Sequence, residues 1–239
     1  MPQSSATFVL VHGAWHGGWC YSRLARILRA KGHDVFTPTL SGLGERSNGY
    51  SPAINASTHV QDIVNVINFE DLQDVVLVGH SYAGIVITKV ADIMPERVRA
   101  LVYLDAFVGE DDKSTFDLDL PEAVAAHLSR AQSSGGHTIP PVPSSAFGAS
   151  IDDQAWIDAK CTPQPFATLA ERLRLSGRFH DVTNRTYIAA NWPNSPFRAV
   201  MARVLSLPGW RVHELPCGHD VMIDMPQEVA ALLQEALTG

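Results

Sequence analysis

A run of aliphatic residues that ends in a glycine and a serine constrains this chain more than any other feature. Residues 74–78 read Asp-Val-Val-Leu-Val, which is typical of a buried strand, and Gly79-His80-Ser81 follows directly. Apolar residues at helical spacing then resume over residues 85–90. Ser81 is therefore predicted on a sharp turn between a strand and a helix, a turn that requires small neighbours. Gly79 meets this requirement, whereas Ala83 stands where a second glycine is usual.

The rest of the chain alternates short apolar runs with helical patterns, joined mostly by short loops. This alternation predicts a parallel sheet that is covered on both faces. We expect a single α/β domain over residues 1–239, with a mostly parallel central sheet of about six strands flanked by helices. The expected strands span 8–11, 35–37, 74–78, 100–104, 186–190 and 211–215, and the expected helices lie around 24–31, 60–67, 85–90, 197–205 and 226–237.

A serine hydroxyl becomes a nucleophile when a histidine accepts its proton and a carboxylate orients that histidine. Of the 10 histidines, His219 is the best placed, because it lies in a loop between the last expected strand and the last expected helix. We predict Ser81 as the nucleophile and His219 as the base.

The acid is less obvious. It usually follows the strand before that of the histidine, but residues 191–196 contain no carboxylate. One strand earlier, Asp105 comes directly after the apolar run 100–104. That position lies at the carboxyl edge of the sheet, where sites of open parallel sheets gather. We therefore predict Asp105 as the acid, with Asp220 and Asp224 as alternatives near His219.

The oxyanion of acyl transfer needs preorganised donors. The backbone NH of Tyr82, just after the nucleophile, is one candidate, and the second is an NH of the glycine-rich loop that follows the first strand, most simply that of Ala14. Phosphate binding is the alternative role for this loop, but the loop lacks the glycine-lysine and glycine-spacing patterns of nucleotide sites.

Residues 109–180 have a different character, with amphipathic pieces around 121–131 and 166–175 separated by Ser-Gly-rich and Pro-rich stretches. Because the linkers to this segment are short, we interpret it as a cap insertion over the active-site face and not as an independent domain. The side chains that we expect to line a substrate pocket are apolar or aromatic: Trp15, Phe107, Trp156, Phe166, Trp192 and Met222.

Composition excludes several classes of function. The formal net charge is −7 and no basic run is present, so nucleic acid is not an expected partner. The first apolar run spans only residues 8–11, which predicts neither a signal peptide nor a membrane span and favours the cytoplasm. Cys20, Cys161 and Cys217 are scattered, so neither a disulfide framework nor a metal site is expected.

With these residues identified, the chain resembles the α/β-hydrolases, and among them the small group that contains plant methyl esterases and hydroxynitrile lyases. The resemblance rests on the stretch from Phe8 to Trp19, on Gly79-His80-Ser81 and on Gly218-His219. It implies an eight-strand fold shortened at its amino terminus, a helical cap, no cofactor and often a homodimer.

Two positions separate the esterases from the lyases in this group. The similar lyases carry a threonine at the place of Gly13 and a lysine at the place of Asp220, and this chain has neither. Haloalkane dehalogenases and some lipases, which are similar in fold, place their acid where Asp105 stands. We expect a serine carboxylesterase that acts on small esters, carbamate esters included. The alternatives are a cofactor-free lyase or carbon-carbon hydrolase, and a non-catalytic relative that binds a small ligand.

Overall fold

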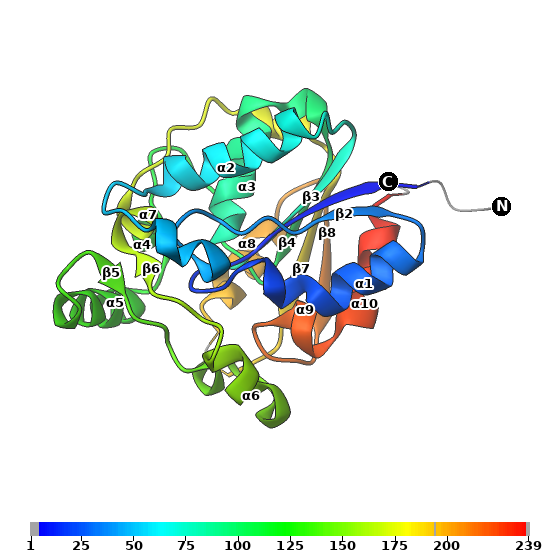
Figure 1. The fold of residues 1–239 in the computed structure, drawn as a ribbon. Helices are drawn as coiled ribbons and strands as arrows, with labels where there is room; N and C mark the ends of the chain where they lie inside the picture. The colour runs from blue at the N-terminus through cyan, green and yellow to red at the C-terminus, as the bar shows by residue number, and fades with distance from the viewer. Residues whose placement is uncertain (1–4, 194, 238–239) are drawn as a thin grey trace.

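A central six-stranded sheet organises the protein (Figure 1). The computed structural model describes residues 5–193 and 195–237. The sheet consists of β1 (Thr7–Val11), β2 (Asp34–Phe36), β3 (Val75–His80), β4 (Val98–Leu104), β7 (Arg185–Ala190) and β8 (Trp210–Leu215). Neighbouring strands run parallel in the order β2-β1-β3-β4-β7-β8. The prediction of a mostly parallel sheet of about six strands is thus confirmed.

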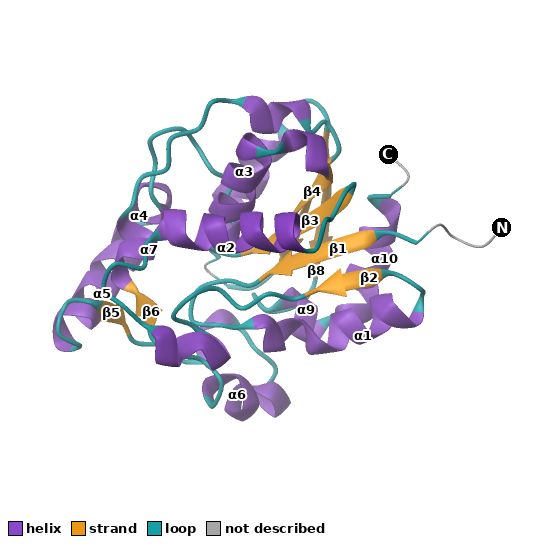
Figure 2. Ribbon diagram, turned by 45° about the horizontal axis from the view of Figure 1, so that its top comes forward, coloured by secondary structure: helices purple, strands orange, loops and turns teal. Residues whose placement is uncertain are grey.

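Helices cover both faces of the sheet, with α2 and α3 on one side and α1, α9 and α10 on the other (Figure 2). The helices are α1 (Ser22–Ala30), α2 (Ala56–Phe69), α3 (Ala83–Ile93), α4 (Thr115–Leu118), α5 (Pro121–Ser133), α6 (Ile151–Asp158), α7 (Phe166–Ala170), α8 (Phe197–Leu205), α9 (Val221–Asp224) and α10 (Pro226–Glu235). Every residue of β3 is buried, as expected for a strand between two helical layers. Within residues 5–193 and 195–237, none of the helices combines the length and apolarity needed to cross a membrane.

The chain between β4 and β7 leaves the sheet and forms a group of short elements beside it (Figure 1). Helices α4–α7 lie in this segment, with a two-stranded antiparallel ribbon of β5 (Thr138–Ile139) and β6 (Gln164–Pro165). The amphipathic piece that we expected over 166–175 is helical only as far as Ala170. Beyond it the backbone of Leu173 pairs with that of Lys113, which draws the chain out of the helix.

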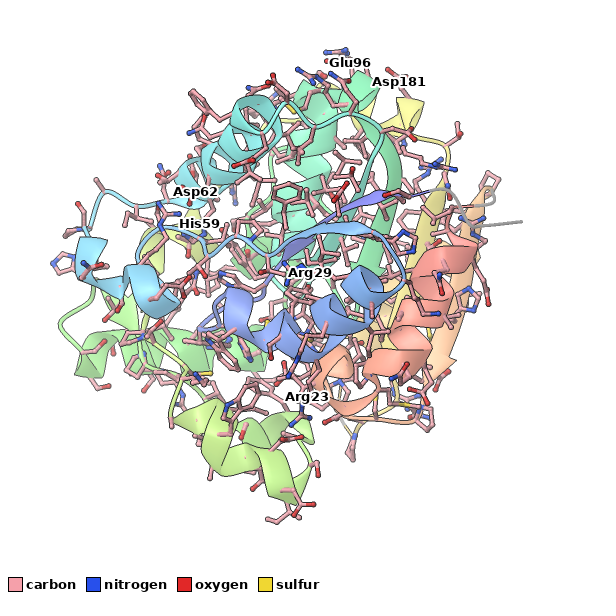
Figure 3. The ribbon with its side chains drawn as sticks, turned by 45° about the vertical axis from the view of Figure 1, so that its right-hand side comes forward. Arg23, Arg29, His59, Asp62, Glu96 and Asp181 are labelled. Carbon is pink, nitrogen blue, oxygen red and sulfur yellow. The ribbon has the colours of Figure 1, made fainter. Side chains whose placement is uncertain are left out.

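Several contacts join this segment to the core. Arg23 on α1 donates to both carboxylate oxygens of Asp153 on α6, at 2.7 and 2.5 Å, and Figure 3 shows Arg23 between these two helices. Glu171 accepts hydrogen bonds from the backbone NH and the hydroxyl of Ser57 at the start of α2. The segment is therefore attached to the helices on both faces of the sheet.

Candidate active site

Ser81 lies at the carboxyl end of β3, on the turn into α3. Its φ is +55°, a left-handed conformation that is rare for a residue with a side chain. The turn is tight, because a Cβ added at Gly79 would come within 2.9 Å of the carbonyl oxygen of Ala83. The Ser81 NH donates to the carbonyl of Leu104 at 3.2 Å, which fixes the turn against the end of β4.

Asp105 follows β4 directly and meets His219 from the loop after β8. His219 Nδ1 lies 2.7 Å from Asp105 Oδ2. A carboxylate can only accept this hydrogen bond, so the proton is on Nδ1 and Nε2 is left as the basic nitrogen. The structure thus brings Asp105 and His219 together across more than 100 residues of sequence.

Asp105 is fully buried and its carboxylate has two further donors. Trp192 Nε1 donates to Oδ2 at 2.8 Å, and the backbone NH of Ala190 donates to Oδ1 at 3.1 Å. Both donors come from the end of β7 and the loop after it, the position from which the acid is usually supplied. Sequence reasoning placed Trp192 in the pocket but missed its bond to the carboxylate.

The glycine-rich loop after β1 packs directly against the turn that carries Ser81. A Cβ at Gly13 would come within 2.8 Å of both the Ser81 Cβ and His80 Nδ1, so this position has room only for glycine unless its neighbours shift. Trp15 has a φ of +65°, and its backbone NH donates to Oε1 of the fully buried Gln164 at 2.9 Å. Gln164 lies in β6 and so anchors this loop from the segment between β4 and β7. No sequence signal pointed to it.

A cavity of about 650 Å³ connects these groups. Residues from the core and from the 109–180 segment line it together, among them Ala14, Trp15, Ser81, Tyr82, Phe107, Phe116, His127, Phe147, Leu169, Trp192, Phe197 and His219. The walls are mostly apolar or aromatic, as is usual for small-molecule sites. Phe197, which sequence reasoning did not identify, stacks on the His219 ring with centroids 5.0 Å apart.

Three of the six expected pocket residues do not line this cavity. Trp156 packs edge-on against Trp19, with ring centroids 5.0 Å apart, and does not line the cavity. Phe166 packs against Phe116, behind the cavity wall. Met222 is completely buried in α9. The expectation for these three is corrected, because helical packing directs their side chains into neighbouring elements.

Two buried histidines near the site have fixed neutral tautomers. His12 Nδ1 donates to the carbonyl of Gly13, while Nε2 accepts from the NH of Leu40; burial lowers its pKa to about 3. His59 on α2 donates from Nε2 to the Ser41 carbonyl, and its Nδ1 faces the Tyr82 hydroxyl at 3.1 Å. Burial lowers the pKa of His59 to about 4. Figure 3 shows His59 beside Asp62 on the same helix.

The alternative acids lie elsewhere. Asp220 points to His16, with 3.3 Å between Oδ1 and Nε2, and Asp224 accepts from the NH of Gly218 at 3.0 Å. Over the described part of the chain, no group of three or more His, Cys, Asp or Glu residues is arranged to hold a metal ion.

This geometry can be compared with known proteins. The model of the alpha/beta hydrolase family matches residues 8–232, almost the whole chain. The chain belongs to the alpha/beta hydrolase family. Its six parallel strands, the serine turn after β3 and the histidine loop after β8 are this member's version of the family fold.

Three relatives of this alpha/beta hydrolase illustrate the group. It is 44% identical over 238 residues to a carbendazim hydrolyzing esterase of Nocardioides sp. (strain SG-4G), with 95% of this chain and 98% of that protein covered. It is 26% identical to the putative chloroplastic methylesterase 11 of Arabidopsis thaliana, over 95% of this chain and 63% of that longer protein. A solved extracellular alpha/beta-hydrolase from a Paenibacillus species superposes with a TM-score of 0.84 at 27% identity, covering 97% and 98% of the two chains. The hydrolase is thus an enzyme whose relatives include methylesterases.

Proposed function

We propose that the protein is a serine carboxylesterase that hydrolyses small carboxylic esters, carbamate esters included, through an acyl-enzyme. The observation that carries this proposal is the 2.7 Å hydrogen bond between His219 and the buried Asp105, at the edge of a cavity that Ser81 also lines. The 44% identity to an esterase over nearly the full length of both chains supports the same class of reaction.

In the first half-reaction, Ser81 Oγ attacks the ester carbonyl carbon and His219 Nε2 accepts the hydroxyl proton. The backbone NH groups of Ala14 and Tyr82 stabilise the negative charge that develops on the carbonyl oxygen, and one such donor is worth about 2.7 to 4 kcal/mol in related enzymes. The tetrahedral intermediate collapses when the carbon–oxygen bond to the alcohol breaks. His219 returns the proton to the departing alkoxide, which leaves as the alcohol.

In the second half-reaction, water attacks the acyl carbon and His219 accepts one of the water protons. The bond to Ser81 Oγ breaks, the serine regains its proton, and the carboxylic or carbamic acid is released. Asp105 stays ionised throughout, holds the Nδ1–H tautomer and stabilises the imidazolium that forms twice per turnover.

The walls of the cavity favour a flat acyl group. Trp15 stacks with Phe147 at 6.0 Å between centroids, and Phe116 stacks with His127 at 6.4 Å, all four on the cavity wall. The relative named for carbendazim hydrolysis supports a heteroaromatic carbamate as substrate. We propose that residues 109–180 act as a cap and supply much of this specificity.

Cyanohydrin cleavage fits this site poorly. The lyases use a threonine at the place of Gly13, and here even a bare Cβ at that position would press on Ser81. They use a lysine at the place of Asp220, which here is buried against His16 and lies off the cavity wall. This chain therefore lacks both side chains that the lyases use, the one for the cyanohydrin hydroxyl and the one for the leaving cyanide.

The test is hydrolysis of p-nitrophenyl acetate and of carbendazim by the unaltered protein, Ser81→Ala and Ser206→Ala. We expect turnover by the first, a loss of about 10³-fold or more in kcat for Ser81→Ala, and no loss for Ser206→Ala, whose serine is exposed at the end of α8. Equal turnover by Ser81→Ala would refute the proposal. Labelling of Ser81 by a fluorophosphonate separates an enzyme from a binding protein, because an unactivated serine reacts poorly.

A further inference from the structure

Behind the proposed catalytic groups, a carboxylate is enclosed by histidines. The side chain of Asp220 has no exposed surface, and neither of its oxygens has a hydrogen-bond partner within 5–193 and 195–237. His16 Nε2 lies 3.3 Å from Oδ1, and His80 Nε2 lies 3.8 Å from the same oxygen. An isolated ionised carboxylate in such a place would cost several kcal/mol, so a cation or a proton must accompany it.

Hydrogen bonds to carbonyl groups determine which histidine supplies that proton. His16 Nδ1 lies 2.7 Å from the carbonyl oxygen of Ala14, so Nδ1 carries a hydrogen. Its Nε2 faces Asp220, and one proton must lie between these two groups because both otherwise only accept. His80 differs, because its Nε2 donates to the His219 carbonyl at 3.0 Å and its Nδ1 has no hydrogen-bond partner in the described chain.

We propose that His16 and Asp220 form a buried ion pair that positions the glycine-rich loop after β1, which contains Ala14, relative to the loop carrying His219. The positional role rests on the proposed esterase function, whereas the ion pair itself does not. His16 holds the Ala14 carbonyl, and the NH of Ala14 is one of the proposed oxyanion donors. Asp220 directly follows His219. A change in the pair would therefore move an oxyanion donor relative to the base.

The charges around the pair agree with this assignment. Burial would lower the pKa of His16, but the Asp220 carboxylate outweighs burial and raises it. Burial would raise the pKa of Asp220, but the neighbouring histidines, His16 first and then His80 and His219, outweigh burial and hold this pKa well below its usual range. The other titratable groups that face the pair are His12, Cys20, Tyr21, His80, Cys161, Cys217, His219 and Asp224.

These surrounding groups do not supply the missing cation. Burial, followed by the neighbouring His219, lowers the pKa of His80 well below its usual value, so His80 stays neutral. Burial raises the pKa of Cys20, which is therefore an uncharged thiol. Trp19 stacks on the His16 ring with centroids 5.2 Å apart and an interplanar angle of 21°, and it screens the pair from water. His16 is thus the one cation in contact with Asp220 among the described residues.

The direct test is the protonation state of His16, measured by ¹⁵N NMR of the imidazole in the full-length protein. We expect both ring nitrogens to be protonated at pH 7.5 in the unaltered protein, and Nε2 to lose its proton in Asp220→Asn. A neutral His16 ring at pH 7.5 in the unaltered protein would overturn the ion pair. This measurement needs no turnover, so failure of the esterase proposal would not affect it.

Stability provides a second, independent test by charge rescue. His16→Asn keeps a donor for the Ala14 carbonyl but leaves Asp220 without its cation, so we expect a marked loss in the midpoint of urea unfolding. Asp220→Asn added to His16→Asn removes the stranded charge, and the midpoint should recover. A double variant at least as unstable as the sum of the two single variants would contradict the pair.

Activity tests the positional role. We expect Asp220→Asn to lower kcat for p-nitrophenyl acetate by about tenfold to 100-fold, with KM nearly unchanged. Asp92→Asn is the matched control. Asp92 is a carboxylate of similar burial (3% exposed, against 1% for Asp220). It pairs with Lys89 near the end of α3, and neither residue lines the cavity, so this variant should keep its kcat. If NMR shows that His16 is neutral in Asp220→Asn and this variant still keeps the kcat of the unaltered protein, the positional role is overturned.

Discussion

At the scale of single residues, the unusual feature is the route by which the carboxylate reaches the histidine. Asp105 has a φ of +40°, which directs the chain sharply out of β4, and its NH donates to the Ile188 carbonyl at 2.7 Å. The strain is maintained because three donors converge on the carboxylate. One of them, Trp192, comes from the loop where most members of the fold keep the acid itself.

Asp105→Asn should lower kcat by about 10³- to 10⁴-fold, because an amide next to Nδ1 favours the wrong histidine tautomer. An asparagine also offers one acceptor oxygen to three donors, and this adds to the disorder of the His219 ring. Steady-state kinetics with p-nitrophenyl acetate measure the effect. Asp224→Asn is the comparison, and we expect it to lose less than about tenfold. If the two variants lose activity equally, Asp105 is not the acid.

Trp192→Phe removes the indole donor to Asp105 and keeps an aromatic ring, although a smaller one, at the cavity wall. A hydrogen bond to a charged group contributes about 1.5 to 3 kcal/mol, so kcat should fall by about tenfold to 100-fold. Trp210→Phe serves as the control, because Trp210 packs against Tyr103 and Arg185 at the amino end of β8 and does not line the cavity. An effect confined to KM would mean that Trp192 contacts substrate and does not support the acid.

At the scale of elements, the segment between β4 and β7 does more than cover the cavity. The glycine-rich loop after β1 is bound to it at three points. The Trp15 NH donates to Gln164, the Trp15 indole donates to the Ile139 carbonyl at 3.0 Å, and the Trp15 carbonyl accepts from the NH of Thr162 at 2.8 Å. The β5–β6 ribbon thus fixes the backbone next to Ala14. In the proposed mechanism, the segment that lines the cavity and sets specificity therefore also holds an oxyanion donor in place.

Gln164→Leu should therefore lower kcat although Gln164 lies off the cavity wall. The change leaves the buried NH of Trp15 without an acceptor, a cost of about 1 to 3 kcal/mol, and the loop should shift to relieve it. We expect a decrease of about tenfold in kcat for p-nitrophenyl acetate. Gln154→Leu removes a single bond to the Ala149 carbonyl within the same segment and should leave kcat intact. If both variants have the same kcat, the β5–β6 ribbon does not contribute to catalysis.

At the scale of the whole molecule, the central sheet and the proximity of its strand ends could be read from the chain. Buried parallel strands appear as apolar runs, and their carboxyl ends share one edge. The observed register, with Gly79 opposite Tyr103 and His80 opposite Leu104, brings the residues after β3 and β4 side by side. For this reason Ser81 and Asp105 could be proposed together without any structure.

What the chain did not reveal is the direction of side chains outside the sheet. Asp220 was an alternative acid because it adjoins His219, yet the side chain of His219 faces Asp105 and that of Asp220 faces His16. Trp156 and Met222 are apolar, and apolarity is the same signal for a pocket wall and for a helix interface. Only the packing of α6 and α9 distinguishes the two.

The buried histidines make the stability of the whole molecule depend on pH. His12, with a pKa of about 3, and His59, with a pKa of about 4, stay neutral in the folded protein, while the unfolded chain takes up protons below about pH 6.5. Their contribution to the free energy of unfolding is therefore complete above pH 6.5 and is lost as the pH falls. His80, whose pKa is also lowered, acts in the same direction. Burial also lowers the pKa of the buried His33, which acts in the same direction. His16, whose pKa is raised, acts in the opposite direction, as one group against four.

We expect the free energy of unfolding, measured in urea, to fall by several kcal/mol between pH 7 and pH 5. Linkage gives about 2 kcal/mol for each neutral buried histidine over this interval. His59→Gln keeps an amide that can donate to the Ser41 carbonyl but does not titrate, so its loss should be smaller by about 2 kcal/mol. If His59→Gln loses as much unfolding free energy between pH 7 and pH 5 as the unaltered protein, His59 is protonated in the folded state. The protonated ring would then donate from Nδ1, and the Tyr82 hydroxyl would accept that hydrogen bond.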